Sequence, residues 1–119
     1  MSTNETATDG DGNPVLLGPV GQEIVFENDD VRVWEITLDP GANQAWHRHN
    51  NPYLVIALEE ARNRIDSLAG ETRLVHEDIG GVVYRDPGEV HMLTNHGLTR
   101  YRSRLIELKF LGESQEGAR

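Results

Sequence analysis

Short runs of alternating apolar and polar residues, separated by turn-forming residues, make up most of the 119-residue chain. A period of two is typical of β-strands that bury one face, and closely spaced turns are typical of a sandwich or barrel. A single turn of helix fits residues 59–63 and is too short to alter this pattern. We therefore predict an all-β fold. Its strands are expected at residues 23–26, 31–38, 53–58, 62–67, 72–76, 81–85, 90–95 and 101–110.

The two ends of the chain lack this alternation. Residues 1–14 are polar and rich in glycine, aspartate and threonine, which indicates a disordered leader, and residues 112–119 have the composition of a short flexible tail. Residues 15–111 remain as one domain, long enough to bury a core without covalent staples. The sequence contains no cysteine, which excludes disulfides, thiolate ligands and cysteine nucleophiles.

Charge and hydropathy exclude two classes of partner. The formal net charge is -9 and no basic stripe is present, so we expect no nucleic-acid partner. No apolar run approaches the roughly 18 residues of a membrane span, so we expect no membrane partner. The polar N-terminal residues do not resemble a secretory signal. We therefore expect a cytoplasmic protein.

Three histidines carry the strongest chemical signal. His47 and His49 lie two residues apart in a strand-like run, and side chains two apart on a strand point to the same side. His91 lies in a distant strand-like run and offers a third imidazole. Such a set suits a divalent first-row metal ion and leaves positions open for water or substrate. The sequence predicts a metal centre formed by His47, His49 and His91.

The segments around these histidines follow a recognisable spacing. Gly41, then five residues, then His47-Arg48-His49 match the opening of the first motif of the cupin superfamily. The spacing of the second cupin motif is matched by Gly80, Gly88, His91 and Asn95. Over about residues 20–110 the chain resembles small single-domain cupins, including those named for β-alanine degradation. The resemblance implies a jelly-roll barrel of two antiparallel sheets, a metal bound by the three histidines, and a homodimer.

The chain departs from the first cupin motif at its glutamate. Tyr53 stands at the three-residue spacing from His49, and Leu54 stands at the four-residue spacing. Because Tyr53 shares strand parity with His47 and His49, we expect its phenol to face the same cavity. We interpret Tyr53 as a catalytic residue that orients substrate or moves a proton; the alternative is a filler of the space left by the glutamate. Without a carboxylate, the full charge of a divalent ion would favour an anionic substrate.

Two functions follow from the resemblance. The first is a metal-dependent enzyme acting on a small acidic or carbonyl-bearing metabolite, with one divalent ion per chain. Fe(II) is favoured and would support dioxygenase-like chemistry, whereas Zn, Ni or Mn would support an isomerase, cyclase or lyase. The second is a non-catalytic cupin that binds a small molecule or a metal.

Other polar residues are given lesser roles. One of Arg85, Arg102 and Arg104 would anchor a substrate carboxylate if it faces inward, and strand parity leaves open which one. His76 is expected to face solvent, and His96 is expected in a turn. Asn95 is expected to tie its turn to the backbone.

Overall fold

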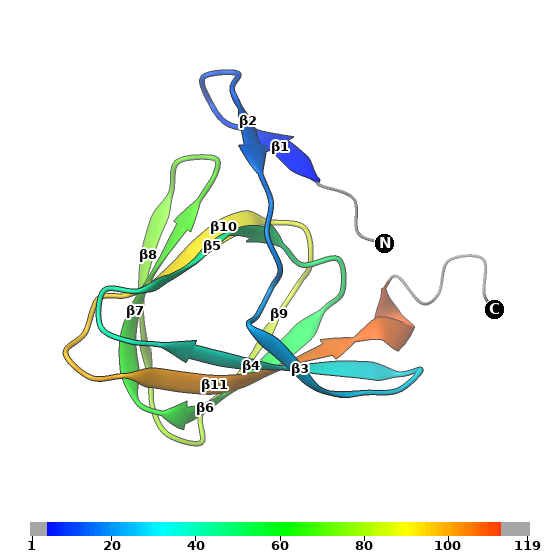
Figure 1. The fold of residues 1–119 in the computed structure, drawn as a ribbon, viewed down its shortest axis with the longest axis vertical. Coiled ribbons are helices and arrows are strands. Elements are labelled where there is room, and N and C mark those ends of the chain that lie inside the picture. The colour runs from blue at the N-terminus through cyan, green and yellow to red at the C-terminus, as the bar shows by residue number, and fades with distance from the viewer. Residues whose placement is uncertain (1–4, 113–119) are drawn as a thin grey trace.

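A computed structural model describes residues 5–112, and within them two antiparallel sheets face each other around a common interior (Figure 1). The five-stranded sheet runs in the order β3 (Glu23–Glu27), β4 (Val31–Leu38), β11 (Tyr101–Leu108), β6 (Tyr53–Glu59) and β9 (Val82–Arg85). The four-stranded sheet runs in the order β5 (Asn43–Arg48), β10 (Val90–Asn95), β7 (Ala61–Ser67) and β8 (Thr72–Glu77). The predicted all-β jelly-roll barrel of two antiparallel sheets is confirmed.

Most strand boundaries lie within one or two residues of those expected. Val31–Leu38 and Val90–Asn95 match at both ends, whereas β11 stops at Leu108 and a 3-10 turn, η1 (Lys109–Leu111), follows it. The segment that resembled a helical turn is a corner instead: β6 ends at Glu59 and β7 begins at Ala61, so the chain passes there from one sheet to the other. Within residues 5–112, no helix is long and apolar enough to cross a membrane.

The expected leader differs from the structure over residues 5–14. There β1 (Thr6–Thr8) and β2 (Pro14–Leu16) pair as a hairpin that projects from the barrel (Figure 1). The Asp9 carboxylate accepts hydrogen bonds from the backbone N–H groups of Asp11 and Asn13, both at 2.9 Å. Polar turn residues that indicated disorder therefore build a tight turn. Residues 1–4 and 113–119, which include most of the predicted tail, lie outside the described residues.

A short segment after the hairpin, residues 18–22, joins the two sheets along one side of the barrel. Gly18 N–H donates to the carbonyl of Trp46 on β5 at 2.8 Å. The Gln22 side chain donates to Gln44 Oε1 at 2.7 Å and accepts from Thr37 N–H on β4 at 2.8 Å. This segment therefore covers the outer edge of β5, which is an edge strand of its sheet.

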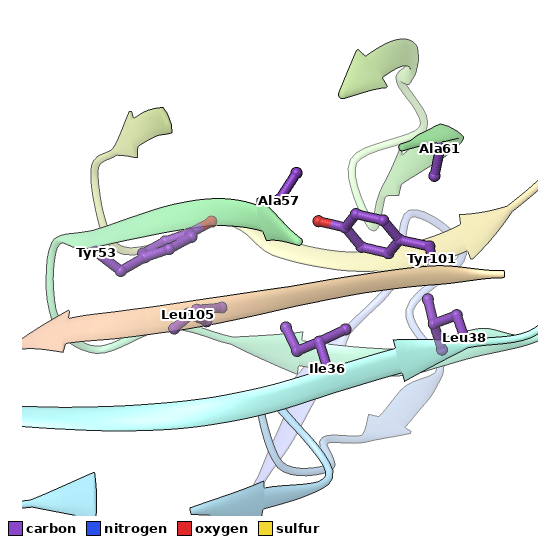
Figure 2. Close-up of a cluster of buried hydrophobic side chains, with 7 residues drawn as sticks. All are labelled: Ile36, Leu38, Tyr53, Ala57, Ala61, Tyr101 and Leu105. Carbon is purple, nitrogen blue, oxygen red and sulfur yellow. The ribbon is translucent and has the colours of Figure 1, made fainter. Parts of the chain in front are cut away.

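Alternation along the strands separates the interior from the outer surface. On β11, Tyr101 and Leu105 are buried and contribute to a core cluster between the sheets (Figure 2). Arg102 and Arg104 point to the opposite face, where both guanidinium groups pair with the Glu35 carboxylate. Neither of these two arginines faces inward. The core cluster consists of Ile36, Leu38, Tyr53, Ala57, Ala61, Tyr101 and Leu105.

Asn95 ties the end of β10 to neighbouring backbone, as expected. Its side chain is fully buried, and its amide Nδ2 donates to the carbonyls of Leu38 at 2.9 Å and Thr99 at 2.8 Å. Its Oδ1 accepts from Gly97 N–H at 2.9 Å. The backbone of Asn95 also pairs with the turn that precedes β5, through Gly41 N–H at 2.7 Å. One side chain therefore holds three backbone groups at the end of the strand that carries His91.

We expect Asn95→Ala to lower the free energy of unfolding by about 2–4 kcal/mol, because it leaves buried backbone groups without hydrogen-bond partners. Urea denaturation followed by tryptophan fluorescence measures this change. Asn43→Ala, at an exposed position on β5, is the matched control and should shift stability by less than about 0.5 kcal/mol. Equal stability of the two variants would contradict the structural role of Asn95.

Candidate metal centre

The three predicted histidines meet inside the barrel. His47 on β5 lies directly opposite His91 on β10 in the antiparallel register, and His49 follows one residue beyond the end of β5. All three side chains are buried, and their ring centroids lie 4.6–5.3 Å apart. One nitrogen from each ring lies within 4.8 Å of the others. The prediction that these residues come together is confirmed by the geometry.

Hydrogen bonds set the orientation of two of the imidazoles. Nδ1 of His47 donates to the backbone carbonyl of Ala45 at 2.6 Å, since a carbonyl oxygen can only accept. Nδ1 of His91 donates to Glu89 Oε1 at 2.8 Å. Each ring therefore keeps its Nε2 lone pair free, which is the arrangement that metal-ligating histidines adopt.

Burial keeps the three imidazoles uncharged. It lowers the pKa of His47 to about 4, against the opposing effect of the hydrogen bond to Ala45. Burial lowers the pKa of His49 to about 2, with smaller contributions from the neighbouring histidines. Burial also lowers the pKa of His91, although Glu89 opposes the shift. Neutral imidazoles are the form that binds metal ions, so the donor set is ready at neutral pH.

His49 provides a further test of whether a metal ion fits. Its Nδ1 is buried and has no hydrogen-bond partner among residues 5–112. Buried polar atoms in native proteins are nearly always paired, so an unpaired imidazole nitrogen beside two other histidines suits a site completed by a bound ion. His47, His49 and His91 are the residues that would hold it.

Tyr53 faces the same space as the histidines, as expected. Its ring stacks on His49 with the centroids 3.8 Å apart and the planes 17° from parallel. Strand parity alone does not explain this direction, because residues 50–52 form a turn between β5 and β6, and alternation does not continue through a turn. β6 belongs to the other sheet, and Tyr53 lies on the face of that sheet that is turned toward the interior of the barrel. Burial raises the pKa of its phenol to about 12, so Tyr53 is a hydrogen-bond donor.

Two connected spaces surround the site. An inner cavity of about 40 Å³ has the three histidines and Tyr53 at one end and mostly apolar walls, including Val55, Leu93 and Leu105. A wider mouth of about 250 Å³ is lined by His49 and His91 but not by His47, and its other lining residues are mainly polar. A small molecule entering from the mouth would therefore reach the imidazoles before the apolar interior.

The charged residues of the mouth include a pair that sequence reasoning missed. Arg73 on β8 donates from both terminal nitrogens to the two oxygens of Glu89, each at 2.9 Å. These hydrogen bonds, aided by the one from His91, lower the pKa of Glu89 to about 2. Glu89 lies just before β10 and two residues before His91, so the sequence could have indicated that the two side chains lie close together. Arg73 carried no such signal, because it comes from another strand.

The remaining candidates separate clearly. Arg85 lines both the cavity and the mouth, which makes it the inward-facing member of the three arginines considered. His76 is exposed and pairs with Glu60 at 2.6 Å, and His96 is exposed beyond the end of β10, as expected for both. His76, Glu60 and Asp78 also lie close enough to share an ion, but all three are on the surface.

Fold and site together define a small single-domain cupin with a buried group of three histidines that could hold a metal ion. Among solved structures, a cupin domain from Bordetella pertussis superposes with a TM-score of 0.69 at 25% identity, covering 73% of this chain and 90% of its own. A cupin 2 conserved barrel domain protein from Salinispora arenicola gives 0.53 at 24% identity, covering 71% and 68%.

A third structure, a protein with a double-stranded β-helix domain from Klebsiella pneumoniae, gives a TM-score of 0.60 at 20% identity. It covers 82% of this chain and 85% of its own. No protein-family model matches the sequence, and no curated protein matches it. The likeness therefore lies in the fold.

We expect Glu89→Gln to weaken the binding of Zn(II) or Co(II) by about 10–100-fold, the usual effect of removing a partner that orients a ligand. The variant loses the negative charge of Glu89, which balances Arg73 and strengthens the hydrogen bond donated by His91. Competition with a chromophoric chelator measures the affinity. Asp86→Asn removes the same charge at an exposed position of the mouth and should leave affinity within about twofold. Unchanged affinity in Glu89→Gln would contradict this role.

Proposed function

We propose that this cupin is a metal-dependent enzyme acting on a small acidic or carbonyl-bearing metabolite. The observation that carries the proposal is the set of three buried, uncharged imidazoles at the junction of a small cavity and an open mouth. Structural metal sites are closed by four protein ligands, whereas three histidines leave room for a substrate atom. A small-molecule partner follows from the size of the two spaces.

Each group of the site has a part in this function. His47, His49 and His91 hold the ion, and Glu89 and the Ala45 carbonyl fix two of the rings. When bound, a divalent ion polarises a substrate oxygen, and Fe(II) in particular supports oxidation by dioxygen. Fe(II) with dioxygenase-like chemistry is the first choice; Zn, Ni or Mn would serve an isomerase, cyclase or lyase.

Tyr53 supplies a hydrogen-bond donor beside the histidines. Because burial keeps its phenol protonated, it can donate to an oxygen of the substrate or pass it a proton. The apolar walls of the inner cavity limit the water around that contact. Tyr53 also belongs to the core cluster, and this observation favours the alternative function, a non-catalytic cupin in which the residue only fills space.

A homodimer is part of the proposal and is supported by the outer face of the five-stranded sheet. In the register of that sheet, neighbouring strands place Phe26, Val33, Ile106, Leu54 and Tyr84 in one row. Phe26 is 54% and Tyr84 is 53% exposed. A continuous apolar row across a whole sheet suits a self-complementary contact between two copies of the chain. A cytoplasmic location also belongs to the proposal.

We expect His47→Ala to lower metal affinity by more than about 100-fold, because losing a direct ligand exceeds the effect of losing its supporting partner. Elemental analysis of protein purified without a histidine tag should give near one ion per chain for the wild type and little for the variant. His76→Ala, in the surface cluster, should retain the ion. Stoichiometric metal in a folded His47→Ala variant would refute the ligand assignment.

The catalytic part is tested by reconstituting the protein with Fe(II) under anaerobic conditions and measuring oxygen uptake with small hydroxy and keto acids. Substrate-dependent uptake would support the dioxygenase. Bound metal and product formation without uptake would support an isomerase, cyclase or lyase. Bound metal without turnover of any acid would favour the binding cupin.

We expect Tyr53→Phe to keep the metal and the stacking on His49 while weakening the binding of oxygen-bearing ligands by about 2–10-fold, the value of one hydrogen bond. Ligand titrations monitored by the visible spectrum of the Co(II) form measure this effect. Tyr84→Phe removes an exposed hydroxyl at the rim and serves as the control. Identical ligand affinities in both variants would reduce Tyr53 to a packing residue.

A further inference from the structure

Arg85 differs from the other arginine of the site because its side chain has no protein partner among residues 5–112. It lies at the end of β9, opposite Tyr53 in the register, and lines both the inner cavity and the mouth. Among residues 5–112, no hydrogen bond or ion pair involves its guanidinium group. The other arginine of the mouth, Arg73, is paired with Glu89 through both terminal nitrogens. Arg85 is therefore the available cation of the site.

The carboxylates that line the two spaces with Arg85 are mostly bound elsewhere. Glu77 accepts a hydrogen bond from the Tyr101 hydroxyl at 2.7 Å on one oxygen and from Asn63 Nδ2 at 2.9 Å on the other. Glu89 is shared by Arg73 and His91. Asp86 also lines the mouth but is exposed. A half-buried guanidinium group without a fixed counter-charge suits a site whose anion arrives with the ligand.

The positive charge of Arg85 influences the pKa values of residues at the proposed metal centre. After the dominant effect of burial, Arg85 contributes to lowering the pKa of His49 and of His91. It also opposes the rise that burial imposes on the pKa of Tyr53. Arg85 therefore acts electrostatically on two proposed ligands and on the proposed hydrogen-bond donor, and an anion bound to it would lie beside them.

We propose that Arg85 binds the carboxylate of the substrate, so that the substrate class is a short monocarboxylic acid carrying a hydroxyl or keto oxygen. This inference rests on the proposed function, because the second oxygen is directed at the three histidines. Guanidinium matches a carboxylate with two parallel hydrogen bonds, which fixes orientation as well as adding affinity. The polar mouth receives the carboxylate, and apolar residues of the inner cavity face the carbon chain.

The size of the inner cavity limits that chain. A volume of about 40 Å³ holds roughly three water-sized groups, since each needs about 10–15 Å³ on this measure. An acid of two to four carbons meets this limit. A longer chain or an aromatic acid would have to remain in the mouth.

The test uses metal-free protein, so that it reports on Arg85 without the metal centre. The probes are glycolate, lactate, pyruvate and 3-hydroxybutyrate, each compared with its neutral amide by NMR titration of ¹⁵N-labelled protein. We expect at least one acid to bind about tenfold or more tightly than its amide, and to shift the Arg85 Nε–Hε resonance. Equal binding of acids and amides, or no binding of any acid, would overturn the proposal.

Two variants locate the effect. Arg85→Gln should abolish the preference for acid over amide, whereas Arg62→Gln removes the same charge from an exposed arginine on β7 and should retain it. Arg85→Lys, which keeps the charge without the paired hydrogen bonds, should bind the acid with intermediate affinity and serves if the glutamine variant does not fold. An unchanged preference in Arg85→Gln would overturn the assignment. Metal content of the His47→Ala variant tests the metal centre separately.

Discussion

The candidate site depends on the antiparallel register between β5 and β10, which sets His47 opposite His91. A slip of one residue in either strand would turn a ligand to the outside of the barrel, because side chains alternate between faces. Hydrogen bonds beyond both ends of the pairing oppose such a slip. Gly41 N–H donates to the carbonyl of Asn95 at one end, and Gly88 N–H donates to the carbonyl of His49 at the other.

The interior joins two environments that serve different purposes. Apolar residues of the core exclude water and thereby keep the histidines uncharged, as their lowered pKa values show. The polar mouth places Arg73 and Glu89 behind His91, where the carboxylate fixes the ring and the arginine keeps the carboxylate ionised. The site therefore combines a dry donor set with a charged entrance, and Arg85 stands at the boundary between them.

Sequence reasoning recovered the parts of this structure that follow local rules. The alternation along residues 31–38 and 90–95 fixed those strands, and the spacing of His47, His49 and His91 gave the donor set. The hairpin at Thr6–Leu16 was missed because its turn uses the same residue types that occur in disordered segments. Contacts between strands could not be predicted from the pattern within one strand. The pairing of Arg73 with Glu89 joins two separate segments, and the inward direction of Arg85 follows from its position opposite Tyr53 in the sheet.

The segment at residues 18–22 has a consequence for the behaviour of the protein in solution. β5, which carries His47 and leads directly into His49, is an edge strand, and exposed edges invite pairing with strands of other molecules. On that edge, Gly18 N–H donates a hydrogen bond to the Trp46 carbonyl, and the Pro19 carbonyl accepts one from the Gln44 side chain at 2.8 Å. The segment thereby protects the edge of a strand that carries a proposed metal ligand from pairing with other molecules, while its Val20 lines the inner cavity.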